Sequence, residues 1–328
     1  MAKILNVKLK RLQELLRRQD PPSWSPHYEP GIKATREEAP SCSRPSQIWA
    51  QQLGRYVHAL SLVEQKVVLL ALFYLRMFEL HEQRMLSTEA RPHPLMGHPR
   101  AAGLELPNLR GSIDVCDRLD MIDRHQWIYV KDPASGEEVP APIPFLGDYL
   151  LFLFDEHGPY CVNWTVKMSA EDFERPMMAA RPVKDPAAQQ LLVRSRHAIE
   201  DLYYLDAGIP TVRIVERDIP ERFAANLRNL ILIQHRAASA DAVVYQEVCE
   251  RLRASMQTGQ TPMEVLLSVM HRHGIDLDLA RALFYRSIWL RDVRPELLDD
   301  VIFIDRPLKP ERVDPYQKFG HWFARPQY

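Results

Sequence analysis

The sequence has few glycines and few cysteines, and both shortages exclude classes of site. Only 12 of the 328 residues are glycine, and neither Gly-x-x-x-x-Gly-Lys nor Gly-x-Gly-x-x-Gly occurs. Nucleotide-driven enzymes use such loops to cradle phosphates, so the sequence argues against that class. Four cysteines, Cys42, Cys116, Cys161 and Cys249, lie far apart with no Cys-x-x-Cys pair and no histidine at finger spacing. This pattern argues against a zinc site and against a disulfide framework.

Long apolar runs and a strong net charge are also missing. The apolar run over 67–75 ends at Arg76, well short of the roughly 20 residues that a membrane span needs. Charged residues interrupt the first apolar stretch, so it does not form a secretory signal. We therefore expect a cytoplasmic protein with no membrane partner. The net charge of −1 provides no global basic field, so DNA contact would need a local patch or partners that hold the DNA.

The length and composition are those of a soluble protein with more than one domain. A chain of 328 residues can bury two cores, and 46% apolar with 26% charged residues is typical of globular proteins. Residues 3–19 have the spacing of a basic amphipathic helix that packs on the body or touches DNA. Six prolines follow within 20–46, which predicts a tether or an extended wrap.

A β-hairpin is predicted over 147–167, where two runs of aromatic and β-branched residues flank a polar turn that ends at Gly158. Asp148 opens the first strand and Lys167 closes the second. This arrangement suits a metal-dependent nuclease, in which a carboxylate holds a divalent ion on the scissile phosphate and a lysine orients water or stabilises charge. The alternative is that both are ordinary solvent-facing residues at strand ends.

A strongly apolar helix is predicted from Ser61 to about Glu82. Ser61 with Glu64 three residues later is a capping-box pattern, in which the glutamate accepts hydrogen bonds from backbone donors at the helix start. The functional alternative is that the Glu64 carboxylate faces a metal site.

The other patterns predict an α/β domain with a mixed sheet that ends near residue 236. A loop is expected over 87–112, and His93 and His98 within it have no partners at metal spacing. The remaining predicted elements of this domain are a helix over 112–122, a strand over 126–130, a turn over 131–136, a proline-containing connection after Lys167, a helix over 185–208, a strand over 210–218 and a helix over 221–235.

Beyond a small-residue linker at 237–242, three short helices are predicted over 241–256, 262–273 and 276–291, followed by an extended piece over 300–305 that would form a wing. This order is typical of winged-helix modules, which bind DNA or dock proteins. The third helix carries basic residues whose spacing does not place them all on one face, namely Arg281, Arg286 and Arg291.

Four segments resemble the TnsA-type transposon-end endonucleases of the restriction-endonuclease-like PD-(D/E)XK nuclease superfamily, over about residues 50–235. These segments are Ser61-Leu-Val-Glu64, Asp148-Tyr-Leu-Leu, Thr165-Val-Lys167, and the stretch 197–219 with its paired tyrosines and Ile-Pro. The resemblance implies a nuclease domain over 47–236, between an N-terminal helix with a tether over 1–46 and a winged-helix-like interaction domain over 237–328.

The same resemblance implies cleavage of the 5′ strand at transposon ends with Mg²⁺, for which Mn²⁺ substitutes. The implied partners are the transposon-end DNA, an integrase-type transposase and an ATP-dependent regulator, which the C-terminal domain would contact. Glu64 and Asp148 would be metal ligands and Lys167 the catalytic lysine. Thr165 and the Val166 carbonyl would complete the metal site.

Two features depart from the family pattern. Thr165 stands where the family usually has Gln or Glu, and a neutral hydroxyl should hold a hard cation more weakly than a carboxylate does. The separation between Glu64 and Asp148 is longer than usual, which makes Asp114 the nearest rival carboxylate. A stand-alone restriction or repair nuclease, and a non-catalytic architectural subunit of a transposition complex, are the alternative functions.

Overall fold

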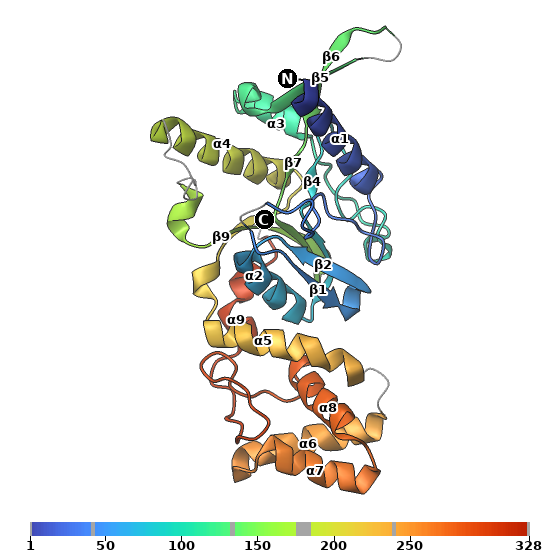
Figure 1. Ribbon diagram of the computed structural model, residues 1–328, viewed down its shortest axis with the longest axis vertical. Coiled ribbons are helices and arrows are strands. Elements are labelled where there is room, and N and C mark those ends of the chain that lie inside the picture. Colours follow the sequence, from blue (N-terminus) through green and yellow to red (C-terminus); the bar gives the residue numbers. More distant parts are fainter. Residues whose placement is uncertain (1, 41–42, 132–134, 175–184, 238–240, 327–328) are drawn as a thin grey trace. The chain divides into compact units, whose positions relative to one another are not determined.

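The computed structural model describes residues 2–40, 43–131, 135–174, 185–237 and 241–326. Contacts divide the chain into two compact units. The first contains Met1–Gln65, Arg76–Glu216 and Phe323–Tyr328, and the second contains Lys66–Leu75 and Arg217–Trp322 (Figure 1). None of the described helices is both long and apolar enough to cross a membrane.

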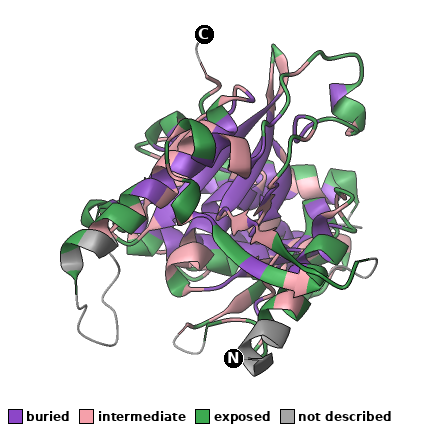
Figure 2. Cartoon of the chain, turned by 90° about the horizontal axis from the view of Figure 1, so that it is seen from above, coloured by how far each residue is buried: buried purple, intermediate pink, exposed green. Residues whose placement is uncertain are grey.

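A four-stranded mixed sheet forms the centre of the first unit. Its strand order is β10-β9-β8-β3. The strands are β3 (Met77–Glu82), β8 (Tyr149–Asp155), β9 (Gly158–Lys167) and β10 (Thr211–Val215). β9 pairs with β8 in the antiparallel sense and with β10 in the parallel sense, which confirms the predicted mixed sheet. Figure 2 shows that most residues along the strands are buried. A sheet that lies between layers buries apolar side chains on both of its faces.

The predicted hairpin over 147–167 is confirmed as β8 and β9. Gly158 follows the turn with φ +101°, a conformation that favours glycine. Adjacent side chains of β9 contact different elements, as alternation across a strand requires. Trp164 packs on Phe323, with ring centroids 4.8 Å apart, whereas Asn163 donates a hydrogen bond to Glu200 of α4 (Pro186–Leu205) at 3.1 Å.

The predicted helix from Ser61 to about Glu82 is wrong at its C-terminal end. Helix α2 covers Leu62–Phe73, and residues 77–82 form β3 instead. The apolar residues continue across the boundary, so helical spacing could not mark where the helix ends. β3 is specified by antiparallel pairing with β8, which lies about 70 residues away, and such tertiary pairing overrides local propensity.

The remaining elements of the first unit are an N-terminal helix and several short strands and helices. They are α1 (Ala2–Gln19), β1 (Ser46–Ala50), β2 (Arg55–Ala59), β4 (Met85–Leu86), α3 (Ser112–Arg118), β5 (Gln126–Lys131), β6 (Glu138–Ile143) and β7 (Phe145–Leu146). The predicted helix over 112–122 ends at Arg118. Strand β6, for which no strand was predicted, contains Pro140 and Pro142, and proline cannot donate to a ladder. Parts of the predicted turn at 131–136 and of the connection after Lys167 lie outside the described residues.

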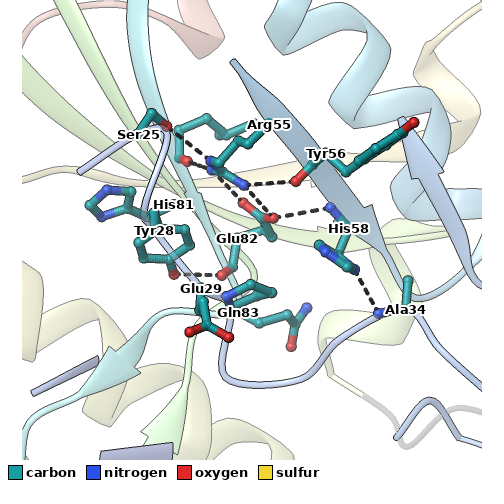
Figure 3. Close-up of polar contacts among 12 residues, drawn as sticks. Ser25, Tyr28, Glu29, Ala34, Arg55, Tyr56, His58, His81, Glu82 and Gln83 are labelled. Atoms are coloured by element: carbon teal, nitrogen blue, oxygen red, sulfur yellow. Dashed lines mark hydrogen bonds and ion pairs between the residues drawn. The ribbon is translucent and has the colours of Figure 1, made fainter. Parts of the chain in front are cut away.

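A buried polar network holds the proline-rich segment and the β1–β2 hairpin on β3 (Figure 3). The Arg55 guanidinium donates to both carboxylate oxygens of Glu82, at 2.8 and 2.9 Å, and the backbone N–H of His58 donates to Glu82 at 3.0 Å. Tyr28 donates to the Glu82 carbonyl oxygen at 2.7 Å, and Ser25 donates to Glu79 through its N–H and hydroxyl. These contacts favour the extended wrap over the loose tether.

Replacing Glu82 with alanine is expected to lower the free energy of unfolding by about 3 kcal/mol, because the buried Arg55 guanidinium loses its bidentate partner and keeps only Glu79, at 4.0 Å. The measurement is urea unfolding of the full chain. Glu156→Ala, in the exposed turn between β8 and β9, is the control and should cost less than about 0.5 kcal/mol. Equal losses in the two variants would contradict a stabilising role for the network.

The second unit consists mainly of helices. They are the C-terminal part of α2, α5 (Glu221–Gln234), α6 (Ala242–Thr258), α7 (Pro262–His273), α8 (Leu277–Trp289) and α9 (Pro315–Lys318). The three helices predicted after residue 240 are confirmed. Helix α5 packs on α8 and belongs to this unit, whereas sequence reasoning places it with the preceding α/β elements.

Two sequence expectations for the second unit are wrong. Residues 300–305 form no strand, because Asn226 of α5 bonds to this segment: its side chain donates to the carbonyl of Asp300 at 2.7 Å and accepts from the N–H of Ile302 at 2.9 Å. Arg291 lies beyond the end of α8 and pairs with Glu311 and Asp314. The three predicted helices are therefore present without the expected wing strand.

Candidate metal and catalytic site

The hairpin brings four of the sequence-predicted site residues together. Asp148 directly precedes β8, and Lys167 is the last residue of β9. The register pairs Tyr149 with Trp164, so it continues to Asp148 beside Thr165. The backbone N–H of Val166 donates to Asp148 Oδ2 at 2.8 Å. The Asp148 carboxylate is therefore fixed against the end of β9, two residues from Lys167 along the strand.

Glu64 reaches the same region from the first turn of α2. The hydroxyl of Tyr149, the residue after Asp148, donates to Glu64 Oε2 at 3.1 Å. The backbone N–H of Leu60 donates to the same oxygen at 3.0 Å, and the N–H of Glu64 donates to Ser61 Oγ at 3.1 Å. The predicted capping interaction is confirmed, and the bond from Tyr149 links the helix start to β8 beside Asp148.

The electrostatics of Glu64 differ from those of a simple cap. Burial, and secondly the negative charge of Asp148, raise the pKa of Glu64 to about 7, although hydrogen bonds from Leu60, Tyr149 and Ser61 oppose the rise. Glu264 occupies the same position of the capping box at α7, where hydrogen bonds from Thr261 lower its pKa. The pKa values of two glutamates in the same local motif are thus shifted in opposite directions. The difference reflects the half-buried position of Glu64 and the negative charge of Asp148 near it.

The oxygen atoms of this region fit a hard divalent cation. Asp148 Oδ1 has no hydrogen-bond donor in the described part of the chain, and Glu64 Oε1 has only the Ser61 hydroxyl, at 3.4 Å. Thr165 Oγ1 is buried without a hydrogen-bond partner among the described residues. Mg²⁺ is usually bound through one or two carboxylates together with waters and substrate phosphates. These atoms suit such an open site.

The described residues form no closed protein cage for a metal ion. Across the residues that the structure describes, no three or more His, Cys, Asp or Glu side chains are grouped so that they could hold a metal ion. Glu64 and Asp148 therefore form a pair, which waters, neutral protein oxygens or a phosphate would have to complete. This arrangement leaves coordination positions for a substrate.

Lys167 provides a positive charge at the same end of the hairpin. Its side chain is half-buried and has no ion-pair partner within the described ranges. This charge acts on His197 of α4. Burial, and secondly the charge of Lys167, lower the pKa of His197 to about 4. A half-buried ammonium without a counter-ion can donate to an incoming anion.

Sequence reasoning did not single out Glu200 of α4, which lies beside the start of the hairpin. The side chain is fully buried, it accepts a hydrogen bond from Asn163 at 3.1 Å, and it pairs with Arg196 at 3.3 Å. A Cβ atom added to Gly147 would lie 3.1 Å from Glu200 Oε1, so this carboxylate borders the residue before Asp148. A charged residue within the buried stripe of α4, beside Ile199 and Tyr203, was the signal that could have identified it.

The structure places the rival residues elsewhere. Asp114 lies in the first turn of α3, where it pairs with Arg110 at 3.2 Å and Arg118 at 2.9 Å. His98 accepts a hydrogen bond from the backbone N–H of Arg100 and caps a short helical turn. Neither side chain joins the pair formed by Glu64 and Asp148.

Comparison with known proteins does not assign the chain to a family. No protein-family model matches the sequence, and no curated protein matches it either.

Proposed function

We propose that this protein is a Mg²⁺-dependent DNA endonuclease that cuts the 5′ strand at transposon ends within a heteromeric cut-and-paste transposase. The observation that carries the proposal is the hydrogen bond from the Tyr149 hydroxyl to Glu64 at 3.1 Å, because Tyr149 directly follows Asp148 and the bond links both carboxylates to the same end of β8. Two carboxylates that repel each other are stabilised by a shared cation. Lys167, at the end of the same hairpin, supports phosphodiester chemistry over a purely structural ion site.

Each residue has a distinct role in this proposal. Asp148 and Glu64 would hold Mg²⁺, which supplies charge neutralisation at the scissile phosphate and a more acidic bound water. The N–H of Val166 orients Asp148, and the Val166 carbonyl and Thr165 hydroxyl add neutral oxygens. The Lys167 ammonium donates to the phosphate oxygen on which negative charge develops, or orients the attacking water.

The proposed partners follow from the same chemistry. A nuclease that cuts only one strand at a transposon end needs an integrase-type transposase to cut and join the other strand. An ATP-dependent regulator is proposed to contact the helical second unit. The net charge of −1 is compatible with DNA that is held largely by such partners.

One observation favours a second candidate, a non-catalytic architectural subunit. Thr165 offers a neutral hydroxyl at the position where a charged ligand would bind the cation more tightly. A subunit that had lost metal binding could still bridge a transposase and its regulator. The metal dependence of the Thr165 variants separates the two functions.

Replacing Thr165 with glutamate is expected to lower the Mg²⁺ concentration for half-maximal cleavage severalfold, because a third carboxylate strengthens the site. Thr165→Val should raise that concentration, or leave it unchanged if the Val166 carbonyl already serves. The measurement is a Mg²⁺ titration of strand cleavage on transposon-end DNA. Thr258→Glu, at the end of α6, is the control for the added charge. An unchanged Mg²⁺ dependence in both Thr165 variants would remove Thr165 from the site.

A further inference from the structure

A second candidate site lies in the first unit, in a cavity of about 610 Å³ whose lining differs from the residues of the proposed nuclease site. The proline-rich segment over 20–46 and the loop after β4 supply most of its walls. Its polar and aromatic lining includes Trp24, Tyr28, Arg84, Arg91, His93 and Tyr203. Cavities of roughly 300–1,000 Å³ with a few convergent polar groups are the usual binding sites of small molecules.

The lining of this cavity carries one uncompensated positive charge. Asp20 is the one acidic residue among the described residues that line it, and Asp20 pairs with Arg91 at 2.7 Å. Arg84 has no carboxylate partner in the described part of the chain. One of its nitrogens lies 2.5 Å from the Nδ1 atom of His81. This contact anchors the guanidinium and leaves its other N–H groups available to a ligand. The cavity therefore favours an anion.

Two further donors accompany Arg84. The Nδ1 atom of His93 accepts a hydrogen bond from the N–H of Leu95 at 3.0 Å, so the neutral ring carries its proton on Nε2. Burial lowers the pKa of His93 to about 4, which keeps this ring neutral at pH 7. The hydroxyl of Tyr203 accepts from the N–H of Ser87 at 2.9 Å, and its own proton has no acceptor among the described residues. A guanidinium, an imidazole N–H and a phenol thus line one cavity.

An aromatic wall completes the lining and is held in place. The indole of Trp24 packs edge-on against His98 and Phe152, with ring centroids 4.7 and 5.1 Å away. The next residue, Ser25, is fixed by its two hydrogen bonds to Glu79. A half-buried indole in a fixed orientation offers a surface on which a planar ring can stack.

The backbone before Arg84 adopts an unusual conformation. Gln83 has φ 49°, in the left-handed region that non-glycine residues rarely adopt. Its N–H donates to the Asp148 carbonyl at 2.9 Å, and its carbonyl accepts from Gly31 at 3.0 Å and from the Gln19 side chain at 3.1 Å. Such strain persists where surrounding contacts enforce it, often at ligand sites. Here it directs the chain from β3 to Arg84.

We propose that this cavity binds a small organic phosphate with a planar ring, of the size of a nucleoside 5′-monophosphate. Arg84, His93 and Tyr203 supply hydrogen-bond donors for the phosphate, and Trp24 supplies the stacking surface. The inference does not depend on nuclease activity, because none of the proposed metal ligands lines the cavity.

Calorimetric titration of the full chain with each of the four nucleoside 5′-monophosphates tests this assignment. At least one monophosphate should bind, and at least tenfold more tightly than its nucleoside or inorganic phosphate alone, because both halves of the ligand contribute. Arg84→Gln should weaken that binding tenfold or more, since a charge-assisted hydrogen bond is lost. Arg44→Gln, which changes an exposed arginine outside the cavity lining, should leave the affinity unchanged.

A second variant guards against misfolding of Arg84→Gln. Met96 is 45% exposed and lines the cavity, so Met96→Trp should block the cavity without disturbing the core. Its thermal unfolding should match that of the wild type while binding is lost. Failure of all four monophosphates to bind at about 1 mM would overturn the proposal, as would unchanged binding in both Arg84→Gln and Met96→Trp. Tighter binding of indole-3-carboxylate than of any monophosphate would overturn the assignment to a phosphate.

Discussion

Replacing Asp148 with alanine is expected to abolish Mg²⁺-dependent cleavage of the 5′ strand, with a loss of about 10³-fold or more in rate, while the fold is retained. In the proposed site the carboxylate would be a charged ligand of the cation, and its only hydrogen bond among the described residues is the one from the N–H of Val166. Because the side chain is half-buried at a strand end, its removal should cost no more than about 1–2 kcal/mol of folding free energy. Strand cleavage and urea unfolding of the same preparation provide the measurement.

Asp148→Asn tests whether cleavage needs the negative charge of this side chain or only its hydrogen bond with Val166. An amide oxygen can still accept from Val166, so the hairpin end should keep its geometry while metal binding is lost. Glu156→Gln, in the exposed turn at the other end of β8, is the matched control and should cleave normally. Cleavage at the wild-type rate by Asp148→Ala would move the active site away from this hairpin.

Replacing Glu64 with glutamine should also eliminate cleavage, because a neutral amide is a poorer ligand for a hard cation than a carboxylate. The capping role should survive, since a capping box accepts glutamine at this position. Near-normal stability together with lost cleavage supports the ligand role. Near-normal cleavage would leave Glu64 as a helix cap only.

The raised pKa of Glu64 adds a pH signature to this variant. Between the ordinary value of 4.5 and about 7, the folded protein keeps a proton that the unfolded chain has released. Glu64 therefore stabilises the fold most at pH below 4.5, and this contribution falls by at most about 3 kcal/mol as the pH rises through 7. In Glu64→Gln that decline should disappear. Added Mg²⁺ favours the ionised form, so it should reduce the decline in the wild type and have no such effect in the variant.

The second capping box provides a control for both measurements. Glu264→Gln alters the same motif at α7, where the side chain accepts from the N–H of Thr261 at 2.7 Å. This variant should cleave normally, and its stability should still decline as the pH rises through 7. Equal effects of the two substitutions on cleavage would point to general destabilisation as the cause.

The elements that were predicted correctly are those specified by residues close together in the sequence. The hairpin was readable because alternating residues and a polar turn define β8 and β9, and the last helices were readable from their caps and spacing, as at Thr261 and Gly274. The strand at 77–82 was not readable, because it continues an apolar run and depends on pairing with β8. The expected wing at 300–305 failed for a similar reason, since its conformation depends on Asn226 of α5.

The candidate site shows the same division. Asp148 and Lys167 could be chosen from the hairpin pattern alone, and Glu64 from the start of a helix. Their proximity could not, because it depends on the hydrogen bond from Tyr149 to Glu64 between elements 85 residues apart. Glu200 was missed although its position beside Ile199 and Tyr203, in the apolar stripe of α4, could have marked it as buried.

The most direct test of the central claim is a strand-specific cleavage assay on transposon-end DNA with Mg²⁺ or Mn²⁺, using the protein alone and together with an integrase-type transposase. We expect a cut in the 5′ strand that requires the divalent ion and is absent from Lys167→Ala and Asp148→Ala. No cut of the 5′ strand with either ion, even with the transposase present, would contradict the proposed nuclease function.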